Sequence, residues 1–257
     1  MDFTLKTYKE LITTLKSHNY TFQTYRDFIA HPASRAIILR HDVDKLPYNA
    51  LQTAIIEYAL GIAGSYYFRI VKESYREPVI RTISMMGHEI GYHYEDLVTY
   101  KGNTQAAYES FCRNLKKFRE FVPVMTISMH GSPLSRWDNR NLWDKYNYRE
   151  LGLTGEPYFD LDYTRILYLT DTGRAWNKFR TNIRDKSREY SSENLHEKYR
   201  FRTSREIMDA AVSGTLPQQV MITMHPQRWT DNFFLWTKEL LIQNIKNFGK
   251  RQIVNKR

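Results

Sequence analysis

The sequence predicts an α/β fold with a parallel sheet, because short apolar runs alternate along the chain with helical patterns. Each apolar run is nearly continuous and stops at a polar residue, as strands do when both faces of a parallel sheet are covered. The chain has 257 residues, enough for one large core, and no repeat or Pro/Gly-rich linker divides it. We therefore expect a single domain, built as a barrel or a doubly wound sheet.

The expected elements begin with an N-terminal helical cover over 1–30, in which apolar residues recur at helical spacing over 4–16. Six apolar runs then predict strands: 36–44, 64–70, 87–93, 124–130, 165–171 and 220–225. Helical patterns lie between them, over 49–60, 78–86, 105–121 and 205–213, and a glycine follows three of these. We expect the catalytic barrel over 36–230, followed by a C-terminal helix and a basic tail over 231–257.

The composition, 42% hydrophobic and 26% charged, is that of a globular chain. The N-terminus has no apolar run long enough for a signal peptide or a membrane span, so we expect a cytoplasmic protein. The net charge of +10 is scattered without a basic stripe, which argues against a nucleic-acid partner. Two basic stretches stand out, 178–188 and 250–257, and the first could face a phosphate-bearing sugar. The single cysteine, Cys112, excludes an internal disulfide and a Cys-rich zinc site.

Ionisable side chains gather at the predicted strand ends, where parallel α/β folds present their reactive groups. They are His41, His93, His130, His225, Asp42, Asp44 and Asp171. A lone histidine at a strand end is more often structural than a ligand, but several on separate strands favour one shared site. Asp42 and Asp44 are two residues apart on an extended segment, so both carboxylates can face that site. Their other interpretation is a turn or helix cap, since the sequence DKLPYN suits a helix start.

A divalent metal suits this mixture of imidazole nitrogen and carboxylate oxygen, with zinc expected and nickel or cobalt as alternatives. Asp44, His93 and one further histidine can supply three ligands and leave a position for water. If the metal binds one carboxylate of the Asp42 and Asp44 pair, the other can act as a general base. We expect His88 and Glu89, in the turn that enters the same strand as His93, to be structural.

These motifs resemble those of the polysaccharide deacetylases of the NodB homology, carbohydrate esterase 4-like family, in the same chain order and over roughly 36–230. The resemblance implies a distorted (β/α) barrel of about seven strands and, from the HDVD first motif, a divergent cytoplasmic branch. In ILRHDVD it implies Asp42 as base and Asp44 as metal ligand, and in VMITMHP it implies His225 as general acid. In GHEIGYHYEDL, His93 matches the family's first metal histidine, but the second is expected at Leu97.

Leucine cannot bind a metal, so we expect His130 in TISMHGSP to replace the missing ligand. Glu95 and Asp96, in the loop after His93, are the alternatives. A loose counterpart of the family's fourth motif occurs in LTDTGRAW, and aromatic residues near the strand ends could stack on a sugar ring. The resulting candidates for substrate binding are Tyr94, Trp137, Asp171 and Trp176.

The resemblance implies a metal-dependent hydrolase that removes an N-acetyl or similar acyl group from a sugar or polysaccharide precursor. The expected substrate is a small molecule or an oligosaccharide, and a nucleotide-linked or lipid-linked sugar would suit a cytoplasmic enzyme. Two alternatives remain open. One is hydrolysis of another amide C–N bond on the same fold, and the other is a catalytically silent carbohydrate-binding module, which the missing histidine motivates.

Overall fold

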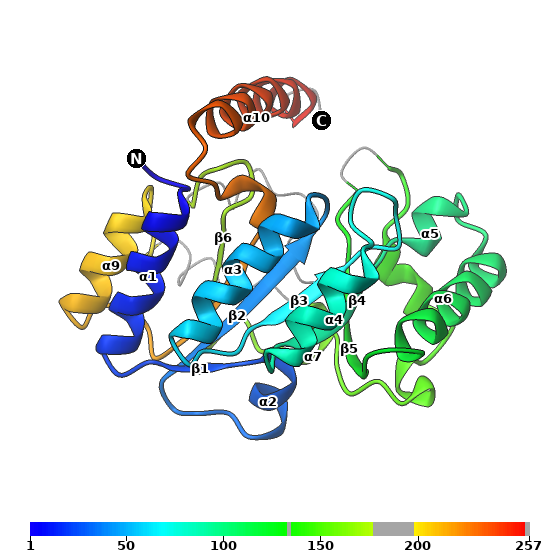
Figure 1. Cartoon of the computed structure of the whole chain (residues 1–257). Coiled ribbons are helices and arrows are strands. Elements are labelled where there is room, and N and C mark those ends of the chain that lie inside the picture. Colours follow the sequence, from blue (N-terminus) through cyan, green and yellow to red (C-terminus); the bar gives the residue numbers. More distant parts are fainter. Residues whose placement is uncertain (133–134, 177–197, 255–257) are drawn as a thin grey trace.

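The computed structural model describes residues 1–132, 135–176 and 198–254. Its centre is one seven-stranded sheet in which every strand pairing is parallel, and helices surround this sheet (Figure 1). The strands are β1 (Thr21–Gln23), β2 (Ala36–Val43), β3 (Ser65–Phe68), β4 (Glu89–Tyr94), β5 (Val124–Met129), β6 (Leu167–Thr170) and β7 (Gln219–Met224). The basic stretch 178–188 falls outside the described residues.

The sheet has the strand order β5-β4-β3-β2-β7-β6, and β1 pairs with the beginning of β2. All six predicted strands are present, and the parallel α/β prediction is confirmed. Within the described part of the chain, no ladder joins β5 to β6 at the two ends of this order. The sheet is therefore compatible with a barrel that is incompletely closed.

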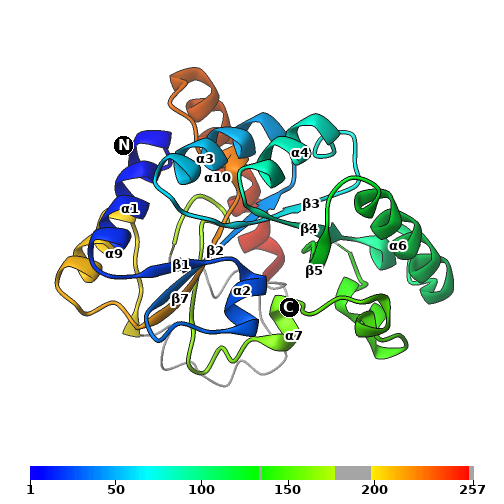
Figure 2. The same cartoon turned by 60° about the horizontal axis from the view of Figure 1, so that its bottom comes forward.

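Most of the longer helices pack on the outer face of the sheet, whereas the longest, near the C-terminus, lies over one edge of the sheet and shorter ones lie at its ends (Figures 1 and 2). The α-helices are α1 (Leu5–Ser17), α2 (Tyr25–Ala30), α3 (Pro47–Ala59), α4 (Glu77–Met85), α5 (Asp96–Thr99), α6 (Thr104–Arg119), α7 (Pro157–Asp160), α9 (Ser204–Val212) and α10 (Phe233–Val254). Short 3₁₀ helices are η1 (Asn139–Asp144), η2 (Tyr148–Leu151) and η4 (Pro226–Arg228). No helix in the described ranges is long and apolar enough to span a membrane.

Local sequence explains where several helices begin. Thr4, Asn103 and Thr203 each accept a backbone N–H and cap α1, α6 and α9. The first 30 residues were predicted only as a helical cover, but they also contain β1 and α2. Both elements are shorter than the window in which helical or strand periodicity becomes visible, so the pattern gave no signal for them.

Strand β2 is buried along its whole length, and alternate side chains face opposite layers. Ile37 and Leu39 pack with α1 and α9 in the outer core, whereas Ile38 packs with inner-face residues such as Tyr67. By the same alternation Arg40 and Asp42 belong to the inner face and His41 to the outer face.

The inner face of the sheet holds large polar side chains because small residues lie beside them. A Cβ atom at Gly91 in β4 would lie 2.3 Å from the ring of Tyr67, so only glycine leaves room for that ring. The Tyr67 hydroxyl then lies 2.9 Å from the hydroxyl oxygen of Thr126 in β5. Glu89 accepts a 2.6 Å bond from Ser65 at the amino end of the strands. The middle of the sheet is thereby filled, and its carboxyl edge is left for other groups.

His41 was one of the four strand-end histidines, but the structure places it away from the other three. Its Nε2 atom lies 2.8 Å from Oε1 of Glu57 in α3, and its ring stacks on Tyr66 with centroids 4.1 Å apart. Glu57 also accepts hydrogen bonds from Tyr8 and from Tyr66. His88 lies 3.4 Å from the same carboxylate, in agreement with its expected structural position. This buried cluster joins α1 and α3 to the sheet.

Replacing Glu57 by glutamine should destabilise the fold by about 3 kcal/mol, because it removes a fully buried carboxylate that contacts His41. Burial alone would raise the pKa of Glu57, but His41 and its hydrogen bonds hold that pKa below its usual value. A carboxylate with a depressed folded-state pKa stabilises the fold above its unfolded pKa of about 4.3 and loses that effect as pH falls further.

The measurement is denaturant unfolding of wild type and Glu57→Gln at pH 7 and at successively lower pH. The difference in the free energy of unfolding between wild type and Glu57→Gln should narrow below about pH 4.3. The exposed Glu10→Gln variant on α1 is the control and should match wild type. A gap at pH 7 no larger than that of the control would contradict a stabilising ion pair.

Candidate functional site

Four strands deliver ionisable side chains to one edge of the sheet. Asp42 lies in β2 with Asp44 just beyond its end, His93 lies near the end of β4, and His130 and His225 directly follow β5 and β7. Because these strands are parallel, their carboxyl ends meet at the same edge. The structure therefore brings together the predicted base, acid and metal ligands.

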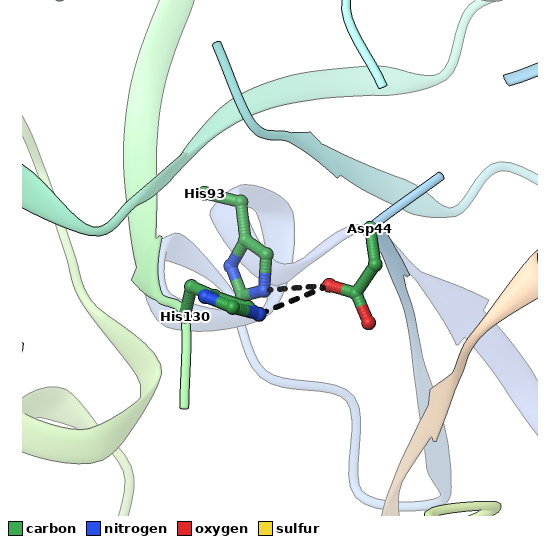
Figure 3. A group of neighbouring side chains, drawn as sticks. All are labelled: Asp44, His93 and His130. Carbon is green, nitrogen blue, oxygen red and sulfur yellow. Dashed lines mark ion pairs between the residues drawn. The ribbon is translucent and has the colours of Figure 1, made fainter. Parts of the chain in front are cut away.

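Asp44, His93 and His130 form the centre of this group (Figure 3). Oδ1 of Asp44 lies 3.6 Å from Nε2 of His93 and 3.6 Å from Nε2 of His130. One ligand atom from each of the three residues lies within 4.8 Å of the other two. Tetrahedral zinc with bonds of about 2.0 Å separates its ligand atoms by roughly 3.3 Å, so small side-chain movements would complete such a site.

The two histidines present the correct atoms for metal binding. Nδ1 of His93 lies 2.9 Å from the carbonyl oxygen of Ser128, so that nitrogen carries the proton and Nε2 keeps its lone pair. Burial lowers the pKa of His93 to about 4, although Asp42 opposes the shift, and the ring is therefore neutral at pH 7. Nδ1 of His130 lies 2.9 Å from Oε2 of Glu95, which again leaves Nε2 toward Asp44.

Arginine pairs with the neighbouring carboxylates but not with Asp44. The three arginine pairs at this edge are Arg40 with Asp42 at 2.7 Å, Arg69 with Glu95 at 2.7 Å, and Arg228 with Asp171 at 2.6 Å. Across the described residues, no lysine or arginine pairs with the Asp44 side chain, and its buried Oδ1 accepts no hydrogen bond. Burying a carboxylate without a cation is costly, so this oxygen fits a divalent metal ion.

The electrostatic surroundings keep Asp44 ionised. Burial would raise its pKa, but His130, His225, His93 and Arg228 together hold the pKa well below its usual range. Its second oxygen, Oδ2, accepts a 3.1 Å hydrogen bond from Gln227 and lies 3.9 Å from Nε2 of His225. One oxygen is thus positioned by the protein while the other is left to a ligand.

The structure distinguishes among the residues considered for the third ligand. Leu97 is buried in the core beside α6, and Asp96 accepts bonds from Tyr92, Ser110 and Asn114 within that core. Glu95 contacts His130 and Arg69 instead of the Asp44 oxygen. His130 is therefore the residue that joins Asp44 and His93, as predicted from its position at a strand end.

Asp42 and His225 each lie next to one member of this centre, Asp42 beside His93 and His225 beside Asp44. Arg40 binds both oxygens of Asp42, with bonds of 2.8 and 2.7 Å. Burial alone would raise the pKa of Asp42, but Arg40, His93 and His225 hold it below its usual value. Nδ1 of His225 lies 2.6 Å from Oδ1 of Asp171, so the Nε2 atom of His225 faces Asp44.

Comparison with protein-family models, with curated proteins and with solved structures gives no match for this chain.

The predicted substrate-binding residues make their contacts within the protein. Asp171 is fully buried and uses both oxygens to bind His225, Arg228 and Trp229, so it positions other side chains rather than substrate. Burial would raise its pKa, but Arg228 and His225 lower it to about 2.

The three predicted aromatic contacts also lie mainly in packing positions. Tyr94 is fully buried, with its ring against Phe111 and Trp143. Trp176 is 4% exposed and donates its indole N–H to Ser204. Both side chains are core residues, because apolar rings at strand ends pack against helices as readily as against a sugar. Trp137 is half-buried and covers Gly102, where a Cβ atom would lie 2.1 Å from its indole nitrogen.

Four residues at the site were missing from the sequence-based prediction: Arg40, Arg69, Gln227 and Arg228. Arg40 gave a usable signal, since it lies two residues before Asp42 on the same strand and must face the same layer. The other three lie beyond strand ends, where the chain direction is set by loops rather than by periodicity.

Glu95→Gln should weaken zinc binding by about 10- to 100-fold, because the carboxylate that orients His130 loses its charge. The measurement is competition for zinc with a chromogenic chelator. Glu120→Gln, at an exposed position after α6, is the matched control and should bind zinc like wild type. Equal affinity in Glu95→Gln and wild type would show that Glu95 does not support a metal ligand.

Proposed function

We propose that this protein is a metal-dependent hydrolase that removes an N-acetyl or similar acyl group from a sugar precursor. The observation that carries the proposal is the buried, unpartnered Oδ1 of Asp44, faced by Nε2 of both His93 and His130. Asp44, His93 and His130 would hold a divalent cation, most simply zinc. When bound, such a cation supplies Lewis acidity, which polarises a carbonyl group and makes a water molecule more acidic.

Asp42 has the properties of a general base for that water. Its Oδ2 atom lies 3.8 Å from Nε2 of His93, so the carboxylate is next to the metal-binding group. Arg40 binds both of its oxygens from one side and fixes the plane of the carboxylate. Each oxygen still has a lone pair for a proton, and its lowered pKa keeps Asp42 ionised at neutral pH.

His225 has the properties of a general acid for the departing amine. Asp171 holds the Nδ1–H, and this fixes the tautomer and directs Nε2 toward Asp44. With Nδ1 held by Asp171, Nε2 is the atom from which His225 would pass a proton to the departing nitrogen.

The hydrolysis of an amide accounts for the base, the acid and the metal-binding group together. A catalytically silent module would have no need for both Asp42 and His225 beside Asp44. The sugar substrate and the NodB-type barrel rest on the resemblance of the strand-end motifs to those of polysaccharide deacetylases.

Asp42→Asn should keep the metal and lower the hydrolysis rate by about 10²- to 10⁴-fold, because the proton acceptor is removed while the three metal ligands stay in place. Asp44→Ala should lose both metal and activity. The measurement is acetate release from nucleotide-linked and oligomeric N-acetyl sugars, together with zinc content. Asp27→Asn, an exposed acid on α2, is the control.

Equal loss of zinc in Asp42→Asn and Asp44→Ala would contradict the assignment of Asp42 as base and Asp44 as metal ligand. Acetate release from simple N-acetyl amides but from no sugar would refute the sugar substrate and favour the broader amidohydrolase.

A further inference from the structure

Helix α10 lies over the carboxyl edge of the sheet, on the same side as the candidate site (Figure 1). Lys45, next to Asp44, is 3.2 Å from Oε2 of Glu239 in this helix. Arg174, which follows β6, donates to the carbonyl oxygen of Trp236 at 3.1 Å, and the Trp236 indole N–H donates to Asp2. The helix is thus attached to loops that follow the strands.

The inward side of α10 is polar. Glu239 and Gln243 are each 7% exposed and hydrogen-bond to each other at 2.7 Å. A helix on a globular protein normally turns its apolar side inward and its charged side to water. In α10 an acidic residue and its amide partner are buried beside the half-buried Trp236 and Leu240, and other apolar residues of the helix are exposed.

The outward side of α10 carries an apolar stripe. Phe234, Leu241 and Ile245 are 82%, 58% and 73% exposed. Their spacings of 7 and 4 residues correspond to about 700° and 400° at 100° per residue, so they lie along one face of the helix. Three large apolar side chains aligned on one face indicate a contact with an apolar partner.

Charge identifies the kind of partner. Between Phe233 and Val254 the only acidic residue is Glu239, which is buried and paired with Lys45. The same segment contains four basic residues: Lys238, Lys246, Lys250 and Arg251. The whole chain has a net charge of +10, which opposes association of two copies and favours an anionic surface.

We propose that α10 docks this protein on an anionic membrane surface through Phe234, Leu241 and Ile245. An exposed apolar stripe on a helix whose sequence is rich in basic residues is typical of helices that lie in the plane of the lipid headgroups. The 22 residues of α10 give a contact of about 33 Å. In the docked orientation, α10 would lie between the bilayer and the loop that carries Asp44 and Lys45. This inference does not depend on the proposed reaction.

The test is co-sedimentation of the full chain with vesicles of phosphatidylcholine alone or mixed with phosphatidylglycerol. Wild type should bind the mixed vesicles, bind the neutral ones far less, and dissociate as salt is raised. The triple variant F234S/L241S/I245S should bind mixed vesicles about tenfold more weakly or worse.

The matched control replaces three exposed apolar residues on α3 and α9, as I55S/Y58S/V212S, and should bind vesicles like wild type. Asp44→Ala should also bind like wild type, which separates membrane docking from catalysis. Absence of binding to the mixed vesicles, or full binding by the α10 triple variant, would overturn the proposal. A wild-type dimer that the α10 triple variant converts to a monomer, without vesicle binding, would assign this face to a second copy instead.

Discussion

The cost of burying carboxylates organises the carboxyl edge of this sheet. Three of them are each neutralised by an arginine: Asp42 by Arg40, Glu95 by Arg69, and Asp171 by Arg228. Asp44 has three histidines and a glutamine around its oxygens but no arginine or lysine paired with its side chain in the described residues. A divalent cation at Oδ1 would compensate that charge and would have His93 and His130 as its further ligands.

The three carboxylates that pair with arginine differ in which other side chains they contact. Asp171 and Glu95 each contact a histidine on its Nδ1 atom, and both histidines then present Nε2 toward Asp44. Asp42 accepts its side-chain hydrogen bonds from Arg40, and its Oδ2 atom lies 3.8 Å from Nε2 of His93. Asp171 and Glu95 thus each fix which ring nitrogen of a histidine is directed toward Asp44.

Periodicity and the strand-end rule were enough to predict the six longer strands and the grouping of Asp42, Asp44, His93, His130 and His225. They could not separate His41 from this group, because a one-residue step along β2 changes the face of the sheet and only tertiary structure shows which face holds the site. They also missed β1, α2 and the arginine partners in loops. Tyr94 and Trp176 show that aromatic residues near a site do not reveal whether they face it.

The most direct test of the account is the metal content of the purified protein by elemental mass spectrometry, for wild type beside His93→Ala and His130→Ala. His31→Ala, at an exposed position after α2, is the control. Near-stoichiometric metal in wild type and the control, with loss in both site variants, is the predicted result. A wild-type protein that binds no zinc, nickel or cobalt even when these ions are added would contradict the metal centre and, with it, the hydrolase.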